Sequence, residues 1–182
     1  MVTCLLHEPG RQSMPQTPKC FEDFAVGDVI PLGVATPDRE ALVAYAMEFD
    51  PAPMHLDDDL ARNAFQYAGD DARGAVVPLD GLIASNWHVG AMFMRTFYDG
   101  LLVGSTSRGA PGMEVLKFPN PVRAGDTIRL TLRVMDIKSS RSRPDMGLVL
   151  FETRGLNQRD ELVIYVTSWT MFGRREVAHA VV

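Results

Sequence analysis

One stretch of the chain organises the rest, and it reads Phe49-Asp50-Pro51-Ala52-Pro53-Met54-His55-Leu56-Asp57. Asp50 and His55 can both do acid/base chemistry, and they stand on either side of a segment stiffened by two prolines. Each proline fixes its own φ at about −65° and pushes the residue before it toward an extended backbone. We therefore expect a non-helical segment whose backbone sets the distance from carboxylate to imidazole, as a catalytic pair requires. The stretch alone leaves a second interpretation open, an ordinary corner between helices with Asp50 bonded to a backbone amide and His55 exposed.

The composition is that of an ordinary globular chain. Of the 182 residues, 46% are hydrophobic and 23% are charged, which suits one domain with a sizeable core. The net charge of −5 and the scattered Lys and Arg residues argue against a nucleic-acid surface, and no apolar run is long enough to cross a membrane. The two cysteines, Cys4 and Cys20, do not have the spacing of metal ligands, and two cysteines near one end of the chain do not form a disulfide framework. We therefore expect a cytoplasmic protein without a metal site.

The first half of the chain alternates short elements with turns. Residues 1–19 mix Pro, Gln, Ser and Thr without periodicity and are expected to form a flexible tail, with residues 20–182 as a single domain. A strand is expected over 29–35. The run Thr36-Pro37-Asp38 then predicts a helix start with the Thr36 hydroxyl as its N-cap, and the helix must end before Pro51. Its buried face is predicted from the spacing of Leu42, Val43, Ala46 and Met47.

Two further helices are expected downstream. The acids of Asp57-Asp58-Asp59 favour the first turn of a short helix, and a loop is expected over 66–79. The longest helix has Asp80 as its predicted N-cap and runs from Gly81 to Asp99. Its apolar residues cover most of its circumference, which predicts a helix buried by the rest of the fold. They are Leu82, Ile83, Ala84, Trp87, Ala91, Met92, Met94 and Phe97.

From Met113 onward the hydrophobic pattern changes to a period of two, as in strands with one face in the core. Strands are predicted over 113–118, 127–134, 147–156 and 161–172. Their connections are short, so we expect antiparallel pairing between sequence neighbours. Such a sheet must hide one apolar face, and the long helix must be covered. The pattern therefore predicts an α+β fold in which a curved antiparallel sheet wraps around a long central helix.

The order of these elements resembles the MaoC-like dehydratases, which include the R-specific enoyl-CoA hydratases. The central motif is Asp50-Pro51-Ala52-Pro53-Met54-His55, followed after five residues by Ala61. Other similar segments extend the resemblance from about residue 21 to residue 172. They are Phe21-Glu22-Asp23-Phe24, Val26-Gly27-Asp28, Gly81-Leu82-Ile83-Ala84-Ser85, Pro121-Val122-Arg123-Ala124-Gly125-Asp126, Ser142-Arg143-Pro144 and Asn157-Gln158. Two positions depart from the family pattern: Ala52 replaces an Asn, and Asp80 stands where hydratases often carry His or Gly.

The resemblance implies a hot-dog fold and a hydro-lyase that adds water to a trans-2-enoyl-CoA thioester, giving a 3-hydroxyacyl-CoA. Such a reaction needs a base for water, a proton for the α-carbon and donors for an enolate-like oxygen. Asp50 and His55, one on each side of a water, can serve the first two needs. With the resemblance, the amide of Gly81 at the head of the long helix is favoured as the oxyanion donor. No cofactor beyond the CoA of the substrate is expected.

Several other residues keep two interpretations. Ser85 is a candidate for contact with the acyl chain, or it caps its own helix. Lys138, Arg141 and Arg143 form a compact basic cluster that either binds the phosphates of CoA or lies in a solvated turn. His88 is expected in the core or at its rim, and Trp87, Met92 and Met94 in the core.

Two competing functions stay open at this point, and one assembly is expected. In a hot-dog thioesterase, Asp80 on the long helix would direct water at the thioester carbonyl. In a non-catalytic module, the fold would bind an acyl thioester without turnover. A sheet wrapped around one helix leaves an edge strand and a helix flank uncovered, which predicts a homodimer or a higher homo-oligomer.

Overall fold

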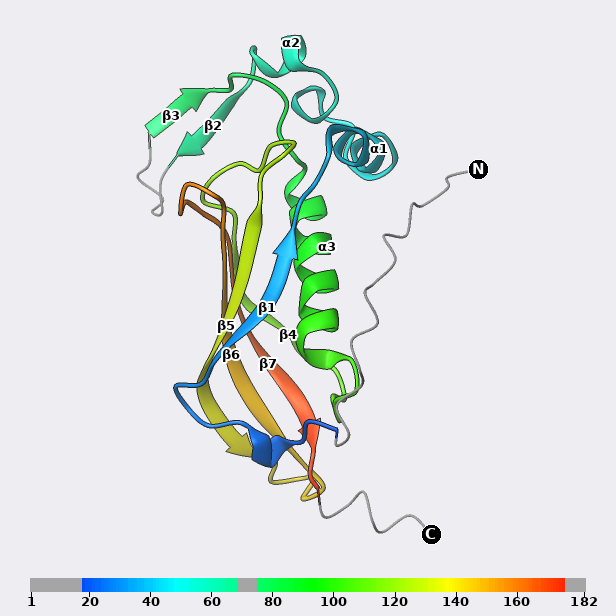
Figure 1. Cartoon of the computed structure of the whole chain (residues 1–182), viewed down its shortest axis with the longest axis vertical. Coiled ribbons are helices and arrows are strands. Elements are labelled where there is room, and N and C mark those ends of the chain that lie inside the picture. Colours follow the sequence, from blue (N-terminus) through cyan, green and yellow to red (C-terminus); the bar gives the residue numbers. More distant parts are fainter. Residues whose placement is uncertain (1–17, 69–74, 176–182) are drawn as a thin grey trace.

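The computed structural model describes residues 18–68 and 75–175. Figure 1 shows a long curved sheet with one helix along it and a group of short elements at one end. The elements are η1 (Phe21–Asp23), β1 (Val29–Ala35), α1 (Arg39–Phe49), η2 (Pro53–His55), α2 (Asp58–Ala61), β2 (Phe65–Ala68), β3 (Ala75–Pro78), α3 (Asn86–Phe97), η3 (Tyr98–Leu102), β4 (Gly112–Lys117), β5 (Ile128–Ser139), β6 (Met146–Leu156) and β7 (Leu162–Gly173).

The expected tail over 1–19 lies outside the described residues up to position 17. Its last residue belongs to the fold, because Lys19 forms a bridge to Ser105 and its carbonyl oxygen accepts a hydrogen bond from the Thr106 N–H at 2.9 Å. The tail prediction was therefore wrong at Lys19.

The main sheet is antiparallel and has the strand order β1-β5-β6-β7-β4. The strands β5, β6 and β7 pair with their sequence neighbours, as predicted. The pairing predicted for β4 was wrong, since it bonds to β7 at the edge of the sheet and not to β5, which follows it. Pro119 and Pro121 interrupt the chain between β4 and β5, and prolines cannot supply the donors of a tight hairpin.

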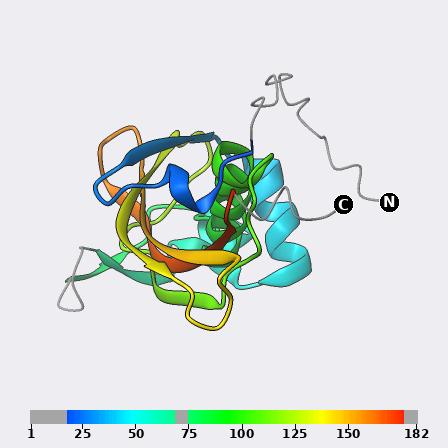
Figure 2. The ribbon, with the colours of Figure 1, turned by 90° about the horizontal axis from the view of Figure 1, so that it is seen from below.

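The sheet curls around α3, and the core lies between them (Figure 2). Side chains of β5 alternate strictly between buried and exposed from Ile128 to Val134, so that every second residue faces the helix. Phe151 of β6 makes edge contacts with Phe24, Phe97 and Phe172, at centroid distances of 5.5, 6.1 and 6.1 Å. Burying one such side chain stabilises the fold by about 1.5–3 kcal/mol. The predicted architecture, a curved antiparallel sheet around a central helix, is confirmed.

The central helix is shorter than predicted, because α3 begins at Asn86 and has Ser85 as its N-cap. Residues 82–84 lie outside it, because Ser85 has a non-helical ψ of 138°, and their N–H groups donate to Asp58, Met54 and Val122. At the other end the chain does not stop at Gly100 but continues through it as the single π-helical turn η3.

One flank of α3 lies open in the single chain, in line with the expected uncovered helix flank, whereas the predicted core positions of Trp87 and Met94 were wrong. Trp87, Met94 and Tyr98 are 65%, 43% and 52% exposed. They follow one another at intervals of seven and four residues, which places them on one stripe of the helix. The opposite stripe, with Val89, Phe93 and Phe97, is buried against the sheet.

Three smaller expectations also differ from the structure. The loop predicted over 66–79 contains a two-stranded hairpin of β2 and β3 in its described part. The N-cap of α1 is Asp38, whose carboxylate accepts from the Ala41 N–H at 2.7 Å, and not Thr36. Met47, predicted in the core, is 69% exposed, while Leu42 and Ala46 are fully buried as predicted.

Candidate active site

The position of Asp50 follows from the end of α1. Pro51 cannot continue a helix, and the residue before a proline avoids helical geometry, so α1 stops at Phe49 and Asp50 is its C-cap. The Asp50 N–H still donates to the Ala46 carbonyl at 2.9 Å, which ties the residue to the last turn. The side chain of Asp50 is thus carried by the end of a rigid helix.

His55 ends a short 3₁₀ turn, η2, that begins at Pro53. The expectation of a wholly non-helical segment was wrong here, since proline is tolerated in the first turn of a helix and Pro53 occupies that place. The imidazole is buried, and its Nδ1 lies 2.9 Å from the carbonyl oxygen of Ile83. A carbonyl can only accept, so Nδ1 carries the hydrogen and, in the neutral ring, Nε2 presents its lone pair.

The two predicted residues meet, and a third joins them. Nε2 of His55 lies 3.5 Å from Oδ2 of Asp50. The hydroxyl of Ser85 donates to the same oxygen at 2.7 Å and also accepts from the Trp87 N–H at 3.2 Å. Ser85, which is fully buried, therefore caps α3 and holds the Asp50 carboxylate at once. The corner interpretation, which required an exposed His55, was wrong.

The segment of residues 81–85 before α3 forms neither helix nor strand and bonds to the turn that carries His55. The Ile83 N–H donates to the Met54 carbonyl at 3.1 Å, so the segment is bonded to the turn that carries His55. Gly81 has a φ of 137°, a region that favours glycine, and its carbonyl accepts from Arg123 at 3.2 Å. Gly81 was predicted to lie at the N-terminus of the long helix, and this was wrong, because the helix starts at Asn86. Its role as an oxyanion donor stays a prediction, now for a loop amide.

Asp80 and the basic cluster lie apart from this geometry. The Asp80 side chain is 90% exposed, precedes the helix, and pairs with Arg123 at 3.3 Å. The cluster of Lys138, Arg141 and Arg143 lies at and beside the β5–β6 turn, at the opposite end of the sheet from α1 and α2 (Figure 1). Lys138 pairs with Asp136 and Arg143 with Asp145. Within one chain, the cluster does not come near Asp50.

His88 lies at the rim of the core, as predicted. Its ring stacks on Tyr45 of α1 at a centroid distance of 4.4 Å and an angle of 7°. Burial lowers the pKa of the His88 imidazole. Its Nδ1 is buried and has no hydrogen-bond partner among the described residues. His88 therefore favours the neutral state in the folded protein.

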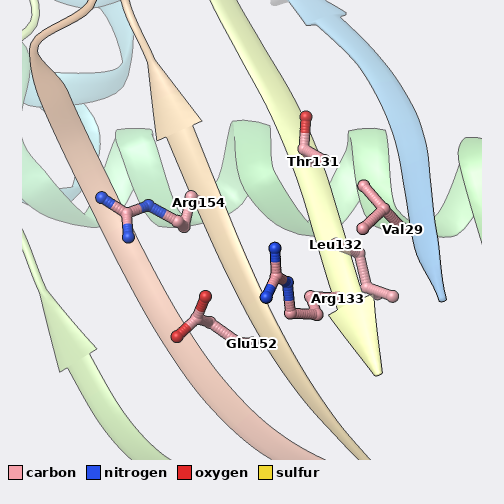
Figure 3. Close-up of a pocket in the computed structure, with 6 residues that line it drawn as sticks. All are labelled: Val29, Thr131, Leu132, Arg133, Glu152 and Arg154. Atoms are coloured by element: carbon pink, nitrogen blue, oxygen red, sulfur yellow. The ribbon is translucent and has the colours of Figure 1, made fainter. Parts of the chain in front are cut away.

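A groove of about 240 Å³ opens on the outer face of the sheet, on the side away from α3 (Figure 3). It is lined by Val29, Thr131, Leu132, Arg133, Glu152 and Arg154. Glu152 accepts a hydrogen bond from the Tyr165 hydroxyl at 3.0 Å. None of the residues predicted for the site lines this groove. Over residues 18–68 and 75–175, no group of three or more His, Cys, Asp and Glu could hold a metal ion, and no helix is long and apolar enough to span a membrane.

Two contributors to the site were missed at the level of sequence. The Ile83 carbonyl orients His55, and the Asp58 carboxylate accepts from the Leu82 N–H at 2.8 Å. The sequence predicted Asp58 only as part of the first turn of a short helix, and Asp58 is indeed the first residue of α2. Its second role joins residues 24 positions apart, and no local pattern carries such a contact.

A sequence model of one family, described as mesaconyl-CoA hydratase, matches residues 10–181. The chain belongs to the mesaconyl-CoA hydratase family. A mesaconyl-CoA hydratase of Cereibacter sphaeroides is 33% identical over 121 residues, which are 65% of this chain and 33% of that protein. The chain thus spans a third or less of the length of the curated members it matches.

Solved structures agree with this membership of the mesaconyl-CoA hydratase family and with the MaoC-like resemblance. A MaoC-like dehydratase from Rhodospirillum rubrum superposes with a TM-score of 0.72 and 36% identity, covering 86% of this chain and 97% of that one. A Mycobacterium tuberculosis protein described as having a double hot-dog fold gives a TM-score of 0.68 at 17% identity, over 86% of this chain and 44% of that one. The fold is therefore the hot-dog fold that the resemblance implied.

Proposed function

We propose that this chain is a hydro-lyase that adds water reversibly to a trans-2-enoyl-CoA thioester to give a 3-hydroxyacyl-CoA. The observation that carries the proposal is the convergence of His55 and Ser85 on one oxygen of Asp50, at 3.5 and 2.7 Å. Membership of the mesaconyl-CoA hydratase family supports it. Because relatives carry that name, mesaconyl-CoA is the first substrate to test, with other enoyl-CoA esters beside it.

Each side chain has a defined part in the proposed reaction. A water between the two groups gives one proton to Nε2 of His55 while its oxygen bonds to C3 of the enoyl group. The same proton then reaches C2, so that one H and one OH are added and the imidazole is neutral again. Asp50 accepts a hydrogen bond from the O–H that stays on the water oxygen, and its charge stabilises the imidazolium while it exists. Ser85 holds the carboxylate in place.

The enolate-like oxygen needs donors during this step, and Gly81 is proposed for that role. The amide would act from a loop rather than from a helix end, since α3 starts five residues later. No cofactor beyond the CoA of the substrate enters the proposed steps. A cytoplasmic location is proposed on the strength of the free, buried thiol of Cys20.

The exposed stripe of α3 and the outer edge of β4 support a homodimer. Trp87 and Met94 of α3 and Tyr98 at the start of η3 expose large side chains, and among the described residues no strand pairs with the outer edge of β4. An exposed apolar surface and an unpaired strand edge both favour association, and a second copy of the chain would cover them. This chain matches 44% of the Mycobacterium tuberculosis protein with a double hot-dog fold. That match supports the pairing of two hot-dog units.

The test of function uses water labelled with ¹⁸O and a panel of enoyl-CoA esters. We expect the enoyl absorbance to fall and mass spectrometry to find one labelled oxygen in a product that is still a CoA ester. A thioesterase would instead release free thiol and place the label in a carboxylate. Asp80, exposed and paired with Arg123, offers that alternative no support. Unchanged esters across the panel would contradict the proposal and favour a non-catalytic module.

A further inference from the structure

We propose that Asp58 is a positioning residue of this site: its carboxylate braces the segment that orients both His55 and Asp50. The inference rests on the proposed hydratase function for its kinetic consequence, although its geometry is independent of it. Asp58 is the first residue of α2, and 43% of its side chain is exposed. It touches neither Asp50 nor His55 through any hydrogen bond described above, so it would act only through other groups.

One carboxylate joins three parts of the chain. Oδ1 of Asp58 accepts from the Leu82 N–H at 2.8 Å, and Oδ2 pairs with Arg39 at 2.7 Å. Arg39 is the first residue of α1, the helix whose other end carries Asp50. Leu82 belongs to the segment of residues 81–85 before α3. The carboxylate thus ties the start of α1, the start of α2 and that segment together.

The brace holds a specific peptide group. The peptide between Gly81 and Leu82 is fixed at both ends, because its carbonyl accepts from Arg123 and its N–H donates to Asp58. The next residue, Ile83, provides the carbonyl that lies 2.9 Å from Nδ1 of His55. Ser85, two residues further along, donates to Asp50. Both members of the catalytic pair are therefore oriented by a stretch of chain that Asp58 anchors.

The close approach of the carboxylate also explains the residue at position 81. A Cβ on Gly81 would lie 3.0 Å from Oδ1 of Asp58, and the φ of 137° is one that side chains rarely adopt. The Leu82 N–H, and after it the Arg39 guanidinium, hold the pKa of the Asp58 carboxyl below its usual value. The ionised carboxylate is accordingly the form that the brace binds.

Removing the brace is expected to change the orientation of His55 more than the stability of the fold. In Asp58→Ala, we expect kcat for hydration to fall about tenfold or more, with a smaller change in KM, since small displacements of catalytic groups cost rates of that order. Asp58→Asn keeps an oxygen that can accept from Leu82 and should recover much of the rate. Asp59→Asn, which removes the same charge one position away where it pairs with Arg62, is the matched control and should leave kcat unchanged.

The decisive readout is the imidazole of His55 in ¹H–¹⁵N NMR spectra of the full chain, assigned by comparison with His55→Gln. We expect the neutral ring to carry its hydrogen on Nδ1 in the wild type and in Asp59→Asn, and a mixture of both tautomers in Asp58→Ala. An unchanged tautomer and an unchanged kcat in Asp58→Ala would overturn the proposal. If the wild type hydrates no ester while the tautomer still shifts in Asp58→Ala, the positioning role stands and the proposed function fails.

Discussion

The hydroxyl of Ser85 donates a 2.7 Å hydrogen bond to Oδ2 of Asp50, across 35 positions of sequence. The bond joins the N-cap of the central helix to the C-cap of α1, so two helix ends meet at one carboxylate. Hydrogen bonds to charged groups are worth about 1.5–3 kcal/mol. The orientation of Asp50 should therefore depend on this one hydroxyl.

Ser85→Ala is expected to lower kcat/KM for enoyl-CoA hydration about 10- to 100-fold, because a loss of that energy converts to that range of rate. The substitution also removes the cap of α3, which costs about 1 kcal/mol of stability. Asp38→Ala removes the cap of α1 without touching the site and provides the control. Equal rates in the two variants, measured well below their unfolding temperatures, would show that the hydroxyl only caps the helix.

His88 should make stability depend on pH. Burial lowers its pKa in the folded state, so below about pH 6.5 the unfolded chain binds more protons than the folded one. Stability should then fall as the pH drops from about 7 into that window, by up to about 1.4 kcal/mol per unit. Urea unfolding at several pH values, compared between wild type and His88→Gln, checks this. Parallel curves for the two proteins would be inconsistent with a buried neutral ring.

Met94→Glu should split the proposed dimer, since it places a charge in the middle of the exposed stripe of α3. Light scattering at micromolar concentration should give twice the chain mass for the wild type and one chain mass for the variant. Val26→Glu, at a position that is 60% exposed and outside the stripe, should remain dimeric. A monomeric wild type would remove the basis of the assembly proposal.

Two helical glycines should respond oppositely to alanine. A Cβ on Gly100 would meet the Leu32 carbonyl oxygen at 2.2 Å, whereas a Cβ on Gly90 would find its nearest neighbour, the Phe118 ring, at 4.0 Å. We expect Gly100→Ala to destabilise the fold by at least about 1–3 kcal/mol and Gly90→Ala to stabilise it by about 0.5–1 kcal/mol. Free energies of unfolding in urea measure both. A neutral Gly100→Ala would mean that β1 and η3 are less tightly packed than the distances indicate.

The sequence predicted the elements whose cause is local. Strict alternation over 127–134 predicted β5 with an error of one residue at its start, although β5 runs on to Ser139, and Pro51 predicted the end of α1 and hence the place of Asp50. The prolines left two interpretations of Asp50 and His55 open, and the family resemblance favoured the pair, whose side chains do lie close together. The resemblance of the segment from Asp50 to His55 to a family motif also implied the hot-dog fold.

What could not be predicted depends on contacts between distant segments. α3 starts only after Ser85, and residues 82–84 before it bond to Asp58, Met54 and Val122, contacts between distant segments that helix propensity does not reveal. The open stripe of α3 differs from the predicted burial because one chain supplies only one sheet for the helix. Of the basic cluster, Arg141 and Arg143 lie in the turn that one of the two interpretations expected and Lys138 lies in β5, and the distance of this turn from the site depends on the direction of β5.

Asp50 and His55 are proposed to perform one hydration reaction together. The most direct measurement is kcat/KM on mesaconyl-CoA, or on the best ester of the panel, for wild type, Asp50→Asn and His55→Gln, with folding checked by circular dichroism. Acid/base groups contribute about 10²–10⁴-fold, so we predict a loss in that range for each single variant, and little further loss in the double variant. A folded Asp50→Asn or His55→Gln protein with wild-type kcat/KM would contradict the account.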